Sequence, residues 1–346
     1  MKIFVMGAAV ALLVTACDGA TDQESVAGES GGRTTQVPVV VYSDLAESEV
    51  KRVFDAYTAE TGVQVQYVFD SEQPLVEKLK AEGRNGSADL LLISDAGTLM
   101  HAAEEDVLRP TYSEILQANI PPYLQDPENM WFALSIAAPA IVYDSREVKP
   151  GELGGYGGLA DRKWHGRLCL ASSGEAANQT LVAMMIAQNG ERPTELLVRG
   201  WMQNLATSVM PGYGELLQAI ESGQCQVGIA TTPHFARLQQ KNSDTSVALF
   251  WPPAEDGGVH INIFGAAVTR HAHNPKAAAA LLEWMSGMAG QRLLSGAIPG
   301  YPVNSSATPH ELLDAWVRYD ASPIRVAQAG MYRVDAVKLL ERARYR

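Results

Sequence analysis

A short apolar strand followed at once by an amphipathic helix opens the globular part of this chain and narrows the folds available to it. Val39–Val41 is an apolar run with the length of a buried strand. Asp44 and Glu47 then stand at the spacing of a capping box, and apolar residues recur at helical spacing up to Tyr57. Because ligands of open α/β sheets bind beyond the carboxyl ends of strands, loop 42–47 is the first place to expect a binding site.

The same order of strand and helix is repeated along the first half of the chain. Alternating apolar residues predict a strand over 63–69, a helix follows over 73–82, and another strand covers 88–93. This βαβαβα order predicts a doubly wound sheet. The stretch 131–144 predicts a long strand interrupted near Pro139, and we expect it to cross between two lobes.

The pattern starts again in the second half. Strands predicted over 167–171 and 226–230 are each followed by a polar turn and a helix. A strand over 260–269 is expected to return to the first lobe. Helices over 309–319 and 334–344 are predicted to close the chain.

The N-terminus predicts export and anchoring. Residues 3–14 are apolar but too few to span a bilayer, and small residues follow up to Cys17. This resembles a bacterial lipobox, in which the cysteine is acylated; the alternative is a plain signal peptide with an incidental cysteine. Asp18 resembles the signal that retains enterobacterial lipoproteins at the periplasmic face of the inner membrane. Residues 18–36 lack large apolar side chains and predict a flexible tether.

Charge and cysteine usage limit the partners and the redox state. The net charge of −12 becomes −13 when Lys2 leaves with the signal peptide, which argues against nucleic acid as a partner. The same charge leaves the lipid anchor as the only expected contact with a membrane. With Cys17 lipidated, Cys169 and Cys225 remain in an oxidising compartment, and we predict that they form a disulfide. The alternative is two separate buried thiols.

From Val39 to the C-terminus the chain resembles the periplasmic ferric-iron-binding proteins of ABC importers, of the iron-deficiency-induced type. The resemblance implies an α/β, two-lobed class II periplasmic solute-binding protein, in which each lobe is a doubly wound sheet and strands form the hinge. The strings that carry it, in order, are Tyr42–Ser43, Ala88–Leu92, Met130–Phe132, Val142–Asp144, Asn178–Ala183, His260–Asn262 and Tyr301–Val303.

This chain departs from the family at the residues that hold iron. The resemblance implies Fe(III) bound by tyrosine phenolates, with two adjacent tyrosines in a turn of the second lobe and arginines near the hinge for an anion. A hard ferric ion favours such anionic oxygen ligands. The corresponding positions here lack phenol and guanidinium groups: Ala46, Glu47, Ala137, Pro139, Ala177, Pro233 and His234. A phenolate-rich ferric site is therefore not expected.

Other polar residues are candidates for the cleft. Each has a structural alternative: Glu47 as a capping partner of Asp44, Asp95 as a helix N-cap, His234 as a turn histidine and Tyr213 as a packing aromatic. The turn with Ser173 precedes a helix and offers backbone N–H groups to an anion or carboxylate. Two hypotheses follow. The first is a mixed nitrogen and oxygen metal site, and the second is a cleft for a small organic solute or an iron chelate. The ligand candidates are Asp44, Glu47, Asp95, Ser173, Tyr213 and His234, of which Glu47, Asp95, Tyr213 and His234 form the metal-site hypothesis.

We therefore expect a monomeric substrate-binding lipoprotein that is not an enzyme and has no resident cofactor. It would deliver iron, another transition metal or a chelate to an ABC permease and its ATPase. The alternative is a non-transport lipoprotein that uses the scaffold to bind a partner or to sense a signal. The predicted parts are a signal peptide over 1–17, a tether over 18–36, lobe 1 over 37–137 with 262–308, and lobe 2 over 138–261 with 309–346.

Overall fold

The structure, a computed structural model, describes residues 37–316 and 319–346. The expected signal peptide, the acylated Cys17 and the tether over 18–36 lie outside the described residues. The described residues belong to one compact unit. Among them, no helix has the length and apolar character needed to cross a membrane.

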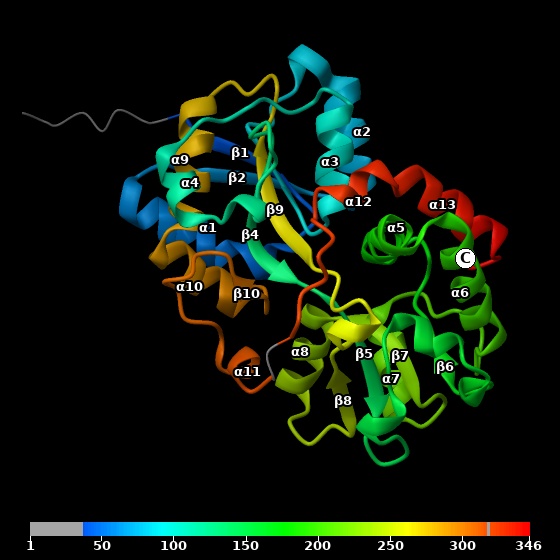
Figure 1. The fold of residues 1–346 in the computed structure, drawn as a ribbon. Coiled ribbons are helices and arrows are strands. Elements are labelled where there is room, and N and C mark those ends of the chain that lie inside the picture. The colour runs from blue at the N-terminus through cyan, green and yellow to red at the C-terminus, as the bar shows by residue number, and fades with distance from the viewer. Residues whose placement is uncertain (1–36, 317–318) are drawn as a thin grey trace, which may run out of the picture. The chain divides into compact units, whose positions relative to one another are not determined.

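A six-stranded mixed sheet forms the first lobe (Figure 1). Its strand order is β10-β4-β9-β3-β1-β2, in which β1 runs parallel to β2 and β3, while β9 runs antiparallel to β3 and β4. The strands are β1 (Val39–Ser43), β2 (Val65–Phe69), β3 (Leu90–Ile93), β4 (Phe132–Ala137), β9 (Asn262–Val268) and β10 (Tyr301–Pro302).

A four-stranded sheet of order β6-β7-β5-β8 forms the second lobe. Strands β6 and β7 are parallel, and β5 is antiparallel to both β7 and β8. The strands are β5 (Pro139–Asp144), β6 (Leu168–Cys169), β7 (Val227–Thr231) and β8 (Val247–Phe250). The fold class is therefore mixed α/β with two sheets, as predicted.

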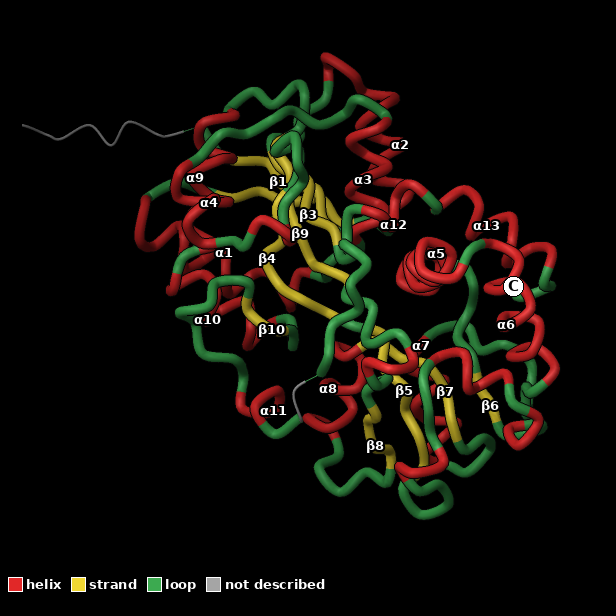
Figure 2. Tube along the Cα trace, in the orientation of Figure 1, coloured by secondary structure: helices red, strands yellow, loops and turns green. Residues whose placement is uncertain are grey.

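Helices cover both sheets (Figure 2). Those that pack around the first sheet are α1 (Glu47–Thr61), α2 (Glu72–Glu82), α3 (Ala96–Glu104), α4 (Glu114–Asn119), α9 (Pro275–Ser286) and α10 (Met288–Ala297). Those around the second are α5 (Ala176–Asn189), α6 (Glu191–Gln203), α7 (Tyr213–Glu221), α8 (Thr232–Lys241) and α13 (Arg333–Arg342). Two short helices, α11 (Glu311–Asp314) and α12 (Gln328–Met331), complete the described set, and α12 packs against both α3 and α5.

Burial follows the predicted apolar runs. All four residues of β3 are buried, and α1 turns Val50, Val53, Phe54 and Tyr57 towards the sheet. The stretch 131–144 is interrupted as expected, because β4 lies in the first sheet and β5 in the second, with Ala138 between them. Ala138 is fixed at the crossing, since its N–H donates to Thr232 Oγ1 at 3.1 Å.

The predicted capping box of α1 is wrong. Asp44 does not cap the helix; its Oδ2 accepts a hydrogen bond from the Ser94 N–H at 2.9 Å and so joins the ends of β1 and β3. The N-cap residue is Ala46, whose N–H donates to Glu49 Oε2 at 3.0 Å. The helix therefore starts at Glu47, two residues later than an Asp44 cap would place it.

Two other elements are shorter than predicted. The strand expected over 167–171 ends at Cys169, because Leu170 turns away from β7 and accepts a hydrogen bond from the Met210 N–H at 2.9 Å. The helix expected over 309–319 is shorter in the structure, where α11 covers Glu311–Asp314. It ends before Trp316, whose indole donates to Gln239 Oε1 at 3.1 Å and packs against Phe235.

Candidate functional site

A cavity of about 100 Å³ lies where the two lobes meet. In the first lobe, the residues that follow the carboxyl ends of β1 and β3 line it. Part of the loop 42–47 therefore lies at the cavity, as predicted. The starts of α5, α7 and α8 line it from the second. Much of its wall is apolar and small: Leu45, Ala137, Ala138, Ala176, Ala177 and Pro233. Its polar wall includes Glu72, Ser94, Glu175, Tyr213, His234 and Arg237.

The four residues of the metal-site hypothesis are not brought together. The described part of the chain holds no group of three or more His, Cys, Asp and Glu side chains placed to bind a metal ion. Glu47 is exposed on the first turn of α1, and its carboxylate lies beside Tyr67 of β2. It is not part of the cavity wall.

Asp95 is buried, and both of its carboxylate oxygens are already used inside the protein. Oδ2 accepts hydrogen bonds from the N–H and the hydroxyl of Thr98, at 2.8 and 3.1 Å, and so caps α3. Oδ1 accepts from Thr180 Oγ1 at 2.7 Å and from Asn262 Nδ2 at 2.8 Å. Because Thr180 is on α5, Asp95 links the two lobes instead of facing a ligand.

Tyr213 and His234 form an aromatic pair in the cavity wall, with ring centroids 4.9 Å apart. The Tyr213 hydroxyl donates to Asn178 Oδ1 at 3.0 Å. Burial, with the nearby Tyr345 and Glu175, raises the pKa of Tyr213 well above its ordinary value, so a phenolate is disfavoured. Burial and the charge of Arg237 lower the pKa of His234 to about 4, so its imidazole is neutral at pH 7. Its Nδ1 lies 2.7 Å from Thr231 Oγ1.

Ser173 lies in the turn before α5 and is half-buried. Its carbonyl accepts a hydrogen bond from Gln179 Nε2 at 3.0 Å. The residue at the N-cap of α5 is Glu175, whose carboxyl group faces the same cavity.

Three carboxyl groups around the cavity hold their protons more strongly than usual. Burial, with the charge of Glu72, raises the pKa of Asp44 to about 8. Burial, with the charge of Asp95, raises the pKa of Glu72, although Arg333 opposes this. Burial, with the charges of Glu72 and Glu215, raises the pKa of Glu175. The protein therefore favours the protonated, neutral form of these carboxyl groups, most of all for Asp44, which is protonated at pH 7.

Sequence reasoning identified Asp44 but missed Glu72 and Glu175. Glu72 begins α2, and the helix dipole alone accounts for an acidic residue at the start of a helix. Glu175 lies in the polar turn before α5. They are 103 positions apart in the sequence. The available signal was that each acidic residue starts a helix directly after a predicted strand or turn.

The nearby arginines are already engaged. Arg237 on α8 forms an ion pair with Glu49 on α1, across the two lobes. Arg333 on α13 donates to Gln73 Oε1 at 3.0 Å. Neither guanidinium pairs with Asp44, Glu72 or Glu175 among the described residues.

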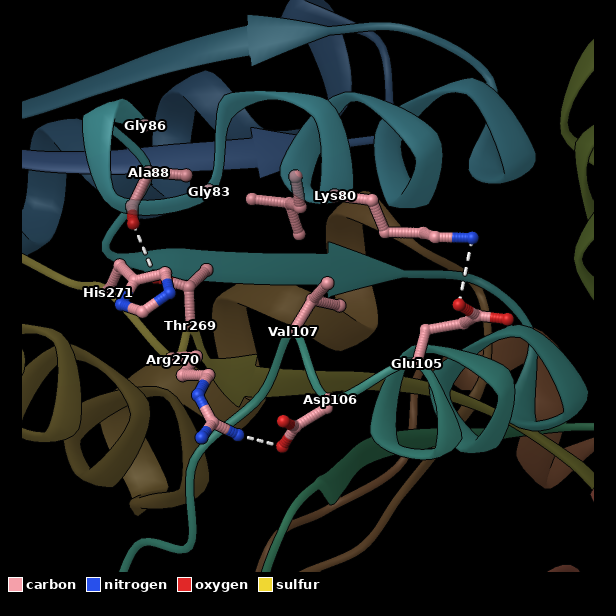
Figure 3. A pocket seen from close by; sticks show the side chains of 11 residues that line it. Lys80, Gly83, Gly86, Ala88, Glu105, Asp106, Val107, Thr269, Arg270 and His271 are labelled. Atoms are coloured by element: carbon pink, nitrogen blue, oxygen red, sulfur yellow. Dashed lines mark hydrogen bonds and ion pairs between the residues drawn. The ribbon is translucent and has the colours of Figure 1, made fainter.

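A second cavity, of about 330 Å³, lies within the first lobe and is lined by oppositely charged groups (Figure 3). Lys80 Nζ lies 2.8 Å from Glu105 Oε2, and Arg270 forms an ion pair with Asp106. These pairs satisfy each other, and the second lobe contributes nothing to this wall. The cavity between the lobes is therefore the stronger candidate for a ligand site.

Comparison with known proteins agrees with this two-lobed arrangement. Residues 42–292 match the model of the family described as bacterial extracellular solute-binding protein. The chain is 31% identical over 314 residues to iron uptake protein A1 of Synechocystis, covering 89% of this chain and 87% of that protein.

Solved structures show the same similarity. The Trichodesmium protein IdiA (FutA), in complex with iron and citrate, is 29% identical with a TM-score of 0.84, covering 90% of this chain and all of that one. The Bordetella ferric binding protein is 29% identical with a TM-score of 0.79, covering 89% of this chain and 99% of that one. These relatives are binding proteins and not enzymes. With the family model matching well over half of its length, the chain belongs to the bacterial extracellular solute-binding proteins, in the branch of the periplasmic ferric-iron-binding proteins.

Proposed function

We propose that this protein is the substrate-binding subunit of an ABC importer, and that it captures an iron-related ligand in the cavity between its lobes. The observation that carries the proposal is the cavity itself, because both lobes contribute charged and apolar residues to its wall. The similarity to an iron uptake protein and to a ferric binding protein supports iron, another transition metal or an iron chelate as the cargo.

The mode of binding is proposed to differ from a phenolate-held ferric ion. Pro233 and His234 lie in the first turn of α8, which follows β7 directly, and Ala177 is on α5; the family resemblance implies tyrosines at these places. Tyr213, the one phenol in the cavity wall among the described residues, is buried, and its hydroxyl donates a hydrogen bond to Asn178 Oδ1. A ligand set other than tyrosine phenolates is therefore needed.

We further propose that the protein works at the periplasmic face of the inner membrane as a lipid-anchored monomer. The support is the sequence around Cys17 and Asp18. Lobe boundaries at 137/138, 261/262 and 308/309 are retained as part of the proposal. They are compatible with β4 and β5 lying in different sheets.

Native mass spectrometry with elemental analysis tests this function on the full chain purified in detergent from its own membranes. We expect one ligand per chain, and we expect its loss when the protein is partly unfolded and refolded in ligand-free buffer. Deleting the gene is expected to reduce cellular uptake of the same ligand. Protein that carries no ligand, from cells whose uptake is unchanged by the deletion, would contradict the proposal.

A further inference from the structure

Two neighbouring segments carry the chain between the two sheets. At the edge of the first lobe, Ala137 at the end of β4 is paired with Asn262 at the start of β9. The first segment then enters the second sheet at Pro139, where β5 begins, and the other segment returns from the second lobe through His260. A rotation of the lobes must therefore bend the chain between Ala137 and Pro139 and between His260 and Asn262.

On the side of the first lobe, Asn262 is fixed by its side chain. Its Oδ1 accepts hydrogen bonds from the N–H groups of Ala96 at 2.9 Å and Ile263 at 2.8 Å, and its Nδ2 donates to Asp95 Oδ1 at 2.8 Å. Ala137 is paired with Asn262 in the sheet. Both residues therefore move with the first lobe.

On the side of the second lobe, Tyr156 contacts both segments with one side chain. Its hydroxyl donates to the Pro139 carbonyl at 2.8 Å, and the backbone N–H of His260 is a hydrogen-bond donor to the same oxygen. Its ring stacks on the His260 imidazole, with ring centroids 5.6 Å apart and an angle of 9° between the planes. Tyr156 is itself fixed in the second lobe, because its carbonyl accepts a hydrogen bond from the Trp201 indole on α6 at 2.9 Å.

This contact is buried and uncharged. Tyr156 and His260 are only 3% and 1% exposed. Burial raises the pKa of Tyr156 and lowers the pKa of His260 to about 4, so both rings are neutral at pH 7. Removing the Tyr156 hydroxyl would leave a buried carbonyl and a buried N–H without this partner, which is costly.

We propose that Tyr156 is a positioning residue for lobe closure, because it ties both segments of the hinge to the second lobe at one point. Thr232 attaches Ala138 to the same lobe, since its N–H donates to the Ala138 carbonyl at 2.9 Å and its Oγ1 accepts from the Ala138 N–H at 3.1 Å. Bending is then confined to the link between Ala137 and Ala138 in one segment and to Ile261 in the other.

The inference rests on the proposed function, in which rotation of the lobes captures the ligand. A hinge limited to one position in each segment gives the lobes a defined axis of rotation. That axis decides which residues of the two lobes meet around the cavity when the lobes close. Without the Tyr156 hydroxyl, Pro139 and His260 can move independently, and the lobes can meet in several orientations.

Double electron–electron resonance on the full chain in detergent tests this role without any ligand. Spin labels are attached through Ala59→Cys on α1 and Leu196→Cys on α6, both at exposed positions in different lobes. In this labelled protein, Tyr156→Phe is expected to widen the distribution of distances between the labels and to add longer distances. Fluctuation of the hinge moves this readout, whereas a loss of stability alone does not.

Tyr345→Phe is the matched control. Tyr345 is also buried in the second lobe, and its hydroxyl donates to the Ala171 carbonyl at 2.6 Å, away from the two hinge segments. Both variants lose one buried hydroxyl, so both should lower the unfolding temperature, but only Tyr156→Phe should widen the distribution. If Tyr156→Phe does not fold, His260→Leu removes the ring stack and should widen the distribution to a smaller extent.

The outcomes separate this inference from the proposed function. Equal distributions for the wild type, Tyr156→Phe and His260→Leu would overturn the positioning role, while a native protein that carries a ligand would still support the importer function. Widening in Tyr345→Phe as large as in Tyr156→Phe would also overturn the role. A broad distribution confined to Tyr156→Phe and His260→Leu supports it, even if the native protein carries no ligand and the proposed function is wrong.

Discussion

At the scale of single residues, Asp44 shows how a site can oppose the stability of its own fold. Burial is the main cause of its raised pKa, Glu72 repels its charge as well, and only one of its oxygens accepts a close hydrogen bond from another residue. The folded protein therefore prefers Asp44 protonated, whereas an unfolded aspartate ionises near pH 4.

This difference predicts a pH dependence of unfolding. Because the folded pKa of about 8 is above the unfolded value, the stabilising contribution of Asp44 is complete below pH 4. It is lost as the pH rises to 8, at up to about 1.4 kcal/mol per pH unit. Asp44→Asn keeps an oxygen for Ser94 and should be more stable than the wild type at pH 8. Urea unfolding of both proteins at pH 5 and pH 8 measures the effect.

The contradicting outcome is an equal difference between the two proteins at both pH values. Asp55→Asn serves as the control. Asp55 is exposed on α1 in an ion pair with Lys51, so its replacement should change stability little at either pH.

Predictions from the sequence were least accurate for the roles of single residues. It identified Asp95 and His234 by their positions at the ends of strands, and both lie near the cavity. It could not show that Thr98, Thr180 and Asn262 use both oxygens of Asp95, because those partners come from distant parts of the chain. Glu72 and Glu175 were missed for the same reason, since only the tertiary fold brings them to one cavity.

At the scale of elements, most strands and helices could be predicted, because the apolar residues that recur with strand or helix periodicity are also the buried residues. The buried β3 and the four buried apolar residues of α1 are examples. The errors occur where a side chain finds a tertiary partner instead of a local one. Asp44 bonds to β3 instead of capping α1, and Leu170 pairs with Met210 instead of extending β6.

The predicted disulfide is confirmed between Cys169 and Cys225, which are 56 positions apart. It joins the end of β6 to Cys225, two residues before the neighbouring strand β7 begins. Closing a loop of this length restricts the unfolded chain and is worth about 4 kcal/mol in the chain-entropy model. The double variant Cys169→Ala with Cys225→Ala should lose stability by about that amount, measured by chemical unfolding in non-reducing buffer.

A reducing agent provides the control for the disulfide. It should destabilise the wild type to the level of the double variant and leave the variant itself unchanged. Equal stability of the oxidised wild type and the double variant would show that the bond contributes nothing to the second lobe.

At the scale of the whole described unit, a few contacts hold the lobes against each other around the cavity. The Thr180 hydroxyl of α5 donates to Asp95 at the start of α3, and both residues are buried. Arg237 of α8 pairs with Glu49 of α1, and α12 packs on both α3 and α5. Lobes that close by rotation about strands such as β4 and β5 need contacts that form in one state and break in another.

These contacts are expected to differ in strength. Thr180→Val keeps the shape of the side chain but removes a buried hydrogen bond to a carboxylate, a bond worth about 1.5–3 kcal/mol. Glu49→Gln removes a partly exposed ion pair, and exposed pairs are worth about 0–1 kcal/mol. Thr180→Val should therefore shift the ligand-free protein towards separated lobes more than Glu49→Gln does. Small-angle X-ray scattering should then give a larger radius of gyration for Thr180→Val.

A saturating ligand should bring the radius of gyration of Thr180→Val back towards that of the wild type, because ligand contacts favour the closed lobes. Its affinity should be lower by the same free energy that separates the lobes, since part of the binding energy is then used for closure. If Thr180→Val and Glu49→Gln have equal radii and equal affinities, the Asp95–Thr180 bond is not what holds the lobes together. The cavity would then depend on the packing of α12 against α3 and α5.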